Sequence, residues 1–117
     1  MIKNNVEDNR NFTLLTDLYQ LTMMQGYFKE KRTEKVVFDM FYRKNPSDNG
    51  YAICAGLELV IDYIKNLHFT DDDITYLKSL GIFDDDFLKY LKNFKFTGDI
   101  YAIPEGTVVF PMEPLLK

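Results

Sequence analysis

Residues 16–28 read TDLYQLTMMQGYF, and the apolar side chains in this stretch recur at the spacing of an α-helix. We predict a helix over residues 16–31, with the Thr16 hydroxyl as its N-terminal cap. Asp17 then lies where the positive end of the helix dipole favours a carboxylate. One mostly buried stripe is expected to carry Leu14, Leu18, Leu21, Gln25 and Phe28. This helix should therefore pack along one face.

The neighbouring face of this helix carries Tyr19, Thr22, Met23 and Gly26, with the tyrosine close to the helix start. A planar ring beside the Asp17 carboxylate and free backbone N–H groups suits a flat, anionic ligand. The alternative is structural, since tyrosines with a buried ring and a polar tip are common on amphipathic helices. From this segment alone the structural alternative is the more frequent one.

Composition limits the possible classes of protein. A single domain is the natural expectation for 117 residues. The 46% hydrophobic content indicates a globular chain. A net charge of −4 argues against nucleic-acid binding, which needs a basic face. A small anion held by a few local cations stays compatible with this charge.

The single cysteine, Cys54, cannot form an internal disulfide, which fits a reducing cytosol. It lies in the apolar run YAICA at residues 51–55, so we predict a buried side chain rather than a nucleophile. No apolar stretch reaches membrane-spanning length, and the first residues lack a signal-peptide core. We expect a soluble, cytoplasmic chain without membrane contact.

Alternating large side chains predict a strand at residues 34–43 that is at least partly covered on both faces. The sequence NPSDNG at residues 45–50 predicts a turn. Residues 51–55 are expected to return as a short strand, antiparallel to the first. A helix over residues 56–67 follows, because Leu57, Val60, Ile61, Ile64 and Leu67 have helical spacing.

Two short helices with acidic starts come next. Thr70 and Asp73 are placed to form a capping box. A second aspartate triplet at residues 84–86 opens the other helix, and Gly81 suits the helix end between them. The alternative interpretation of the triplets is a pair of Mg²⁺ sites, since hard cations bind carboxylate oxygens. Capping is the better interpretation, since consecutive acids point in different directions. His68 is the only histidine, and no cysteine lies near it in sequence, so a metal role is not expected.

The final third predicts a strand, a turn at Pro104-Glu105-Gly106 and a second strand, over residues 97–111. Residues 113–117 begin another apolar strand. We expect an α+β fold in which the first helix and the short helices pack on antiparallel strands of a barrel-sandwich-like domain. That domain is expected to be incomplete at the C-terminus, as in the N-terminal piece of a longer protein.

Arg43 and Lys44 end the first predicted strand and lead into the polar loop. Two adjacent cations there could close on a phosphate. The alternative is a solvated strand end, which the pattern alone favours.

Four segments taken in order resemble the N-terminal region of nicotinate phosphoribosyltransferases. They are TDLYQLTMMQGYF at residues 16–28, FYRKNP at 41–46, YA with AGLE at 51–58, and IPEGTVVFP at 103–111. The resemblance covers residues 14–116, so residues 1–117 are expected to be the N-terminal domain of such an enzyme. The catalytic barrel domain of the family is absent from this sequence. Two departures are Tyr42, where phenylalanine is usual, and a more polar loop at residues 47–50.

The resemblance implies an enzyme that joins nicotinate to phosphoribosyl pyrophosphate, giving nicotinate mononucleotide and pyrophosphate in NAD salvage. It implies coupled ATP hydrolysis with Mg²⁺ in the full-length enzyme, and neither ligand bound by this segment alone. Family members form homodimers whose active sites are shared between one barrel and the N-terminal domain of the other subunit. The isolated segment is therefore expected to be inactive.

The resemblance also assigns individual residues. Tyr19 matches the tyrosine that contacts the pyridine ring, and Asp17 matches an acid near the same pocket. Arg43 falls in the Arg-Lys stretch of the family and is expected to contact phosphate. The histidine phosphorylated during ATP coupling belongs to the barrel, so His68 is not given that role. No catalytic residue and no metal ligand is assigned to this segment.

Two alternative assignments of function remain. Related enzymes acting on nicotinamide or quinolinate share the architecture, although the combined motifs favour nicotinate. The last third also resembles lipoyl and biotinyl carrier domains, which are binding modules. Those carriers need a lysine at the hairpin tip, where this chain has Pro104-Glu105-Gly106.

Overall fold

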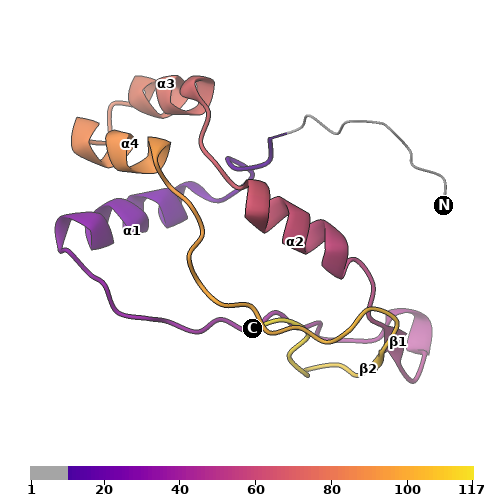
Figure 1. Ribbon diagram of the computed structural model, residues 1–117. Coiled ribbons are helices and arrows are strands. Elements are labelled where there is room, and N and C mark those ends of the chain that lie inside the picture. Colours follow the sequence, from indigo (N-terminus) through magenta and orange to yellow (C-terminus); the bar gives the residue numbers. More distant parts are fainter. Residues whose placement is uncertain (1–10) are drawn as a thin grey trace. The chain divides into compact units, whose positions relative to one another are not determined.

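The computed structural model describes residues 11–117, which divide into two compact units. The first unit contains residues up to 32 together with residues 68–94, and the second contains residues 33–67 and 95–117. Helices and short strands occur together, which confirms the α+β class (Figure 1). The elements in chain order are α1 (Leu18–Lys29), η1 (Pro46–Asp48), β1 (Ala52–Ile53), α2 (Leu57–Asn66), α3 (Asp71–Ser79), α4 (Asp85–Lys92) and β2 (Val108–Val109).

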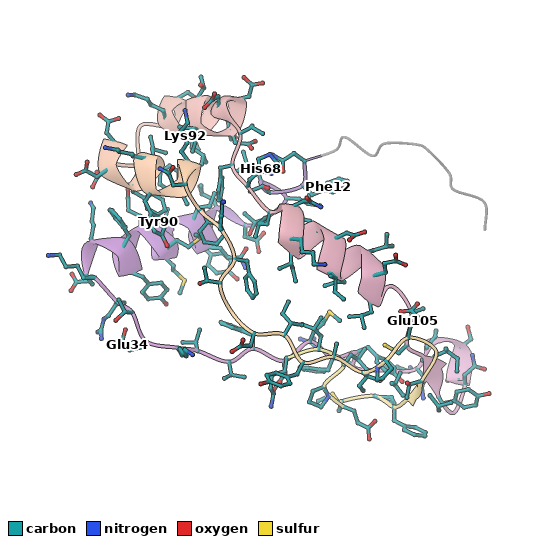
Figure 2. All side chains as sticks on the ribbon, viewed as in Figure 1. Phe12, Glu34, His68, Tyr90, Lys92 and Glu105 are labelled. Carbon is teal, nitrogen blue, oxygen red and sulfur yellow. The ribbon has the colours of Figure 1, made fainter. Side chains whose placement is uncertain are left out.

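Helices α1, α3 and α4 build the first unit around an aromatic core. Phe87 of α4 is completely buried, and its ring centroid lies 5.8 Å from those of Phe28 and Phe83. The Phe28 ring of α1 also lies 5.0 Å from Tyr90 of α4, which Figure 2 labels. The buried members of the cluster are Leu21, Phe69, Leu77, Phe83, Phe87, Leu88 and Leu91. Aromatic contacts therefore fix α1 against α4.

Helix α1 is shorter than predicted, and it begins differently. Its N-cap is Asp17 and not Thr16, which corrects the predicted cap. The Gln20 side chain accepts a hydrogen bond from the Asp17 backbone N–H at 3.2 Å. Leu21 is buried as predicted, but Leu18 is 52% exposed, against prediction. Met24 packs on the core instead, because the buried face is centred between Leu21 and Met24.

The capping predicted for the aspartate-rich helix starts is confirmed at α3, whereas at α4 the N-cap side chain makes no hydrogen bond to the helix. The Thr70 hydroxyl accepts from the Asp73 N–H at 3.1 Å, and the Asp73 carboxylate accepts from the Thr70 N–H at 2.8 Å. Asp84 is the N-cap of α4. Gly81 follows α3 with φ +67°, a left-handed conformation that favours glycine after a helix end. These capping signals involve residues only three or four positions apart, so they can be recognised from the local sequence alone.

The second unit contains α2 and a set of short antiparallel pairings. The five predicted apolar positions of α2 are all half-buried, whereas Leu59 on its other side is 75% exposed. β1 pairs with β2, with Ala52 opposite Val109. β1 was expected to pair with residues 34–43, and that prediction is wrong.

The predicted strand at residues 34–43 is formed only in part. Met40 makes an isolated antiparallel bridge with Leu116, whereas residues 36–38 lie outside every helix and ladder of the described structure. The side chains of these three residues are 70–79% exposed, so the expectation that both faces are covered is also wrong. A pleated strand is stabilised by cross-strand neighbours, which this segment lacks among the described residues.

The last third turns where predicted, but its strands pair elsewhere. The Thr107 N–H donates to the Pro104 carbonyl at 3.3 Å, which closes the turn. The segments on either side of it do not pair with each other: β2 joins β1, and Ala102 bridges to Leu116. Within the described chain the β1–β2 sheet has two strands and is not closed, so the barrel-sandwich part of the prediction is not confirmed.

Candidate functional site

The start of α1 presents a carboxylate, a ring and helix N–H groups together. Asp17 is the N-cap residue, and Tyr19 is the second residue of the helix. Both residues are exposed, and Tyr19 retains 59% of its accessible surface. The Thr16 hydroxyl and the Asp17 N–H both bind the Gln20 side chain, which orders the residues before the helix. The Tyr19 ring is thus exposed among the described residues rather than buried within its own unit.

The remainder of α1 is held firmly, which fixes the position of its first turn. Gln25 donates to the Ile82 carbonyl at 3.1 Å and accepts from the Asp84 N–H at 2.7 Å. Lys29 pairs with the Asp84 carboxylate at 2.5 Å. Gln25 was expected to lie in the buried stripe. It is half-buried, and its side chain makes hydrogen bonds to the segment before α4. The first turn therefore projects from an anchored helix.

Arg43 lies in the second unit, at a bend before η1. Its side chain is exposed. The preceding residue is better fixed, because the Tyr42 hydroxyl lies 2.9 Å from both the Val109 carbonyl and the Asn45 side-chain oxygen. Desolvation, and then the charge of Glu113, raises the pKa of Tyr42. The structure thus brings Asp17 and Tyr19 together on one helix, whereas Arg43 belongs to the other unit.

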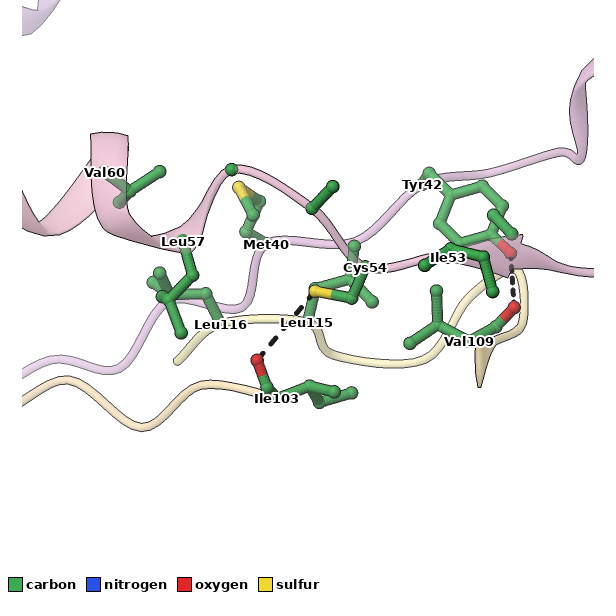
Figure 3. Close-up of a pocket in the computed structure, with 13 residues that line it drawn as sticks. Met40, Tyr42, Ile53, Cys54, Leu57, Val60, Ile103, Val109, Leu115 and Leu116 are labelled. Atoms are coloured by element: carbon green, nitrogen blue, oxygen red, sulfur yellow. Dashed lines mark hydrogen bonds between the residues drawn. The ribbon is translucent and has the colours of Figure 1, made fainter. Parts of the chain in front are cut away.

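An apolar pocket of about 250 Å³ lies in the second unit (Figure 3). No residue that lines it carries a formal charge. Cys54 lines this pocket and is half-buried rather than fully buried as predicted, with its Sγ atom 3.9 Å from the Ile103 carbonyl. The lining is Met40, Tyr42, Ala52, Ile53, Cys54, Ala55, Gly56, Leu57, Val60, Ile103, Val109, Leu115 and Leu116. Such a surface suits hydrocarbon groups and not a phosphate.

Glu105 has a role that the sequence did not reveal. Its carboxylate accepts hydrogen bonds from the Gly56 N–H at 2.9 and 3.1 Å and from the Leu57 N–H at 3.0 Å. It thus caps α2 from a turn far along the chain, and Figure 2 shows it beside the start of that helix. These backbone donors lower the pKa of Glu105, and desolvation opposes them. The available signal was Gly56, an N-cap without a side chain that could satisfy the helix.

This contact also bears on the carrier-domain rival. A carrier presents a lysine at its hairpin tip, but the tip residue here is a glutamate engaged with the start of α2. The same turn is tied down by the Gly106 N–H, which donates to the Cys54 carbonyl at 2.8 Å. A tip bound in this way is unsuited to carrying a swinging covalent cofactor.

The described residues form neither a metal-binding cluster nor a membrane-spanning helix. In residues 11–117, no group of three His, Cys, Asp or Glu side chains is placed to hold a metal ion. The described helices are too short or too polar for any of them to cross a membrane. The carboxylates of residues 11–117 therefore do not form a Mg²⁺ site among themselves.

Comparison with known proteins gives a consistent family. The family model described as the nicotinate phosphoribosyltransferase (NAPRTase) N-terminal domain matches residues 14–117. A nicotinate phosphoribosyltransferase of Mycobacterium tuberculosis is 44% identical over 104 residues, covering 89% of this chain and 22% of the relative. That of Bacillus subtilis is 40% identical over 108 residues, covering 92% of this chain and 22% of the relative.

A solved structure supports the same assignment at the level of the fold. The crystal structure of human nicotinic acid phosphoribosyltransferase matches with a TM-score of 0.73 and 32% identity. The match covers 86% of this chain and 21% of the human one. The chain thus spans about a fifth of the length of the relatives that it matches. Since the family model covers nearly all of it, this chain belongs to the nicotinate phosphoribosyltransferase family and corresponds to the family's N-terminal domain.

Proposed function

We propose that this chain forms the N-terminal part of an enzyme that joins nicotinate to phosphoribosyl pyrophosphate, in NAD salvage. The products are nicotinate mononucleotide and pyrophosphate. Support comes from relatives named for nicotinate at 40–44% identity in two bacteria. The observation that carries the proposal in this chain is the exposed pair of Asp17 and Tyr19 at the anchored start of α1.

Tyr19 is proposed to stack on the pyridine ring of nicotinate. A stacked ring orients the pyridine nitrogen toward the ribose carbon and excludes water from one face. Such a contact contributes about 0.5–1.5 kcal/mol beyond area burial. This is enough for orientation but supplies little of the catalysis, so stabilisation of the departing pyrophosphate is assigned to cations outside this segment.

Asp17 and Arg43 are also proposed as substrate-binding residues. Asp17 fixes the first turn of α1 as its N-cap, so its carboxylate lies near the proposed ring site. The exposed guanidinium of Arg43 is suited to a bidentate contact with a phosphate. Neither residue is proposed to form a covalent bond with the substrate.

The remaining features of the full-length enzyme are proposals drawn from family membership. ATP hydrolysis is proposed to be coupled to turnover, and Mg²⁺ would neutralise phosphate charge when bound. Both are assigned to other parts of the enzyme, since the described residues do not form a metal site among themselves. We further propose a cytoplasmic homodimer with shared active sites, and no activity for this segment alone.

The role of Tyr19 is tested by steady-state kinetics of the full-length enzyme. Tyr19→Ala should raise the nicotinate KM by about 2- to 12-fold, the equivalent of the stacking energy. Tyr19→Phe retains the ring and should leave KM within about twofold. Tyr76→Ala is the matched control, because Tyr76 is a similarly exposed tyrosine on α3 of the same unit. Unchanged KM and kcat in Tyr19→Ala would remove this residue from the site.

The identity of the pyridine substrate needs a separate assay. Nicotinate, nicotinamide and quinolinate should be compared side by side with the full-length enzyme, by mononucleotide formation. We expect the highest kcat/KM with nicotinate. A higher value with either of the other two would refute the substrate while leaving the fold assignment intact.

A further inference from the structure

The segment that enters α1 carries the one buried polar side chain of residues 11–117, that of Thr13, which is 6% exposed. Its hydroxyl oxygen lies 2.7 Å from the His68 carbonyl oxygen and 2.6 Å from the Asn11 side-chain oxygen. Figure 2 labels Phe12 and His68, which belong to the two segments that meet at this contact. Thr13 therefore joins the entry of α1 to the segment before α3, across 55 residues of sequence.

Asn11 extends this contact to the start of α3. Its side-chain amide donates to Asp73 Oδ2 at 2.8 Å, and the same oxygen accepts the Thr70 N–H at 2.8 Å. The Asn11 side-chain oxygen also accepts the Thr13 N–H at 3.0 Å. The Asp73 carboxylate thus closes the capping box of α3 and binds the entry of α1 at once. Removing a donor from such a network leaves an acceptor unsatisfied, which costs more than the bond itself contributes.

The first turn of α1 has little other support. All four residues from 17 to 20 are exposed, and Leu21 is the first residue of the helix that is buried. The polar anchor at Gln25 lies in the second half of the helix. Helix ends with few buried contacts open more easily than the packed centre. Thr13 precedes the N-cap Asp17 by only four residues, so it is close enough to limit this opening.

We propose that Thr13 is a positioning residue for the nicotinate site, where it holds the first turn of α1, and with it the Tyr19 ring, in place. The inference rests on the ring contact of Tyr19 in the proposed function. Thr13 acts through Tyr19 rather than on a substrate, because its own side chain is buried within the first unit. Loss of the hydroxyl lets the first turn adopt positions in which the ring is misplaced. A binding-competent state that is only partly populated weakens the apparent affinity in proportion.

Steady-state kinetics of the full-length enzyme separates positioning from folding. Thr13→Val removes the hydroxyl and should raise the nicotinate KM by about 2- to 12-fold, the equivalent of one hydrogen bond, with kcat nearly unchanged. Thr13→Ser retains the hydroxyl and should restore the parent KM. A purely structural role would reduce the folded fraction, which lowers kcat and leaves KM unchanged, and that result would overturn the proposal. Thr75→Val is the matched control, because the Thr75 hydroxyl is exposed and donates within α3, to the Asp71 carbonyl at 2.8 Å.

A double-mutant cycle tests whether Thr13 acts through Tyr19. The ring is absent in Tyr19→Ala, so adding Thr13→Val to that variant should raise KM by less than about twofold further. Full multiplication of the two single effects would overturn the proposal, since Thr13 would then affect KM by another route. An unchanged KM in Tyr19→Ala would refute the ring contact and the positioning role together. A raised KM in Tyr19→Ala without one in Thr13→Val would refute the positioning role alone.

Hydrogen exchange provides a readout that does not depend on substrate. The Gln20 N–H donates to the Asp17 carbonyl at 3.0 Å, and the Asp17 N–H donates to the Gln20 side chain at 3.2 Å. In the full-length enzyme both amides should exchange about 2- to 12-fold faster in Thr13→Val and at the parent rate in Thr13→Ser. The Glu30 N–H, which donates to the Gly26 carbonyl at 3.0 Å at the far end of α1, is the internal control. Unchanged exchange at Asp17 and Gln20, or an equal increase at Glu30, would overturn the proposal.

Discussion

Phe87 is the residue on which the stability of the first unit should depend most. Its side chain is fully buried, and its ring contacts Phe28 on α1 and Phe83 before α4. Truncation of a buried phenylalanine to alanine costs about 3–5 kcal/mol, which combines lost transfer energy with a cavity. Domains of this size are stable by only about 5–15 kcal/mol. Phe87→Ala should therefore remove a large part of the unfolding free energy.

Urea unfolding followed by far-UV circular dichroism measures this effect. With a slope of about 2 kcal/mol/M, the midpoint of the helical transition should fall by about 1.5–2.5 M. Tyr76→Ala, at an exposed position on α3, should change stability by less than about 0.5 kcal/mol. A shift of less than about 0.5 M for Phe87→Ala would refute the assignment of this ring as the centre of the core.

Two further predictions concern helix starts. Thr70→Ala removes the hydroxyl that accepts from the Asp73 N–H, and should destabilise the first unit by about 0.5–2 kcal/mol in the same urea assay; a Thr70→Ser variant should retain most of the stability. Glu105→Gln removes the charge that caps α2, and should speed amide exchange at Gly56 and Leu57. Because the pKa of Glu105 is lowered in the fold, its contribution is present above the unfolded pKa and is lost as the pH falls through the folded pKa. Amide chemical shifts at Gly56 and Leu57 should follow that acid titration in the parent chain and be flat in Glu105→Gln; a titration retained in the variant would contradict the contact.

Short-range features of the fold could be predicted from the sequence. The Thr70–Asp73 capping box and the positive φ of Gly81 need only residues within a few positions, and both are present as predicted. The apolar spacing of α2 likewise predicts its half-buried side. Leu18 shows the limit of this reasoning. Its spacing fits the predicted buried stripe. In the structure, however, the core packs against Leu21 and Met24 of α1, and Leu18 lies outside this face.

Long-range pairing could not be predicted in the same way. Alternation in residues 34–43 identifies an extended segment but contains no information on its partner, and β1 pairs with β2 more than fifty residues later. The loop at residues 45–50 contains η1, with Ser47 and Asp48 at positive φ, so it does not close a tight hairpin. Glu105 was missed for the same reason, since its carboxylate meets α2 from 48 and 49 residues away.

In the candidate site, too, the local features could be predicted from the sequence and the long-range ones could not. The helix dipole and cap pattern predicted that Asp17 lies at the start of α1 with Tyr19 beside it, and the structure agrees. Their use in binding nicotinate came from resemblance, and it stays a prediction until the kinetic test. Arg43 is exposed at the end of the predicted strand, as expected, but its proposed phosphate contact depends on groups outside the residues described.

The interleaving of the two units has a consequence for biosynthesis. The helical unit uses residues up to 94, whereas the other unit needs residues 95–117 to supply β2 and Leu116, which bridges to Met40. During translation the helical unit can fold first, once residue 94 has been made. Residues 33–67 of the second unit have then been translated, but the residues that pair with them, 95–117, have not. The apolar residues 36–38 are thus exposed on the nascent chain for longer than any core residue of the first unit. A chaperone that binds extended apolar peptides would meet its best target there.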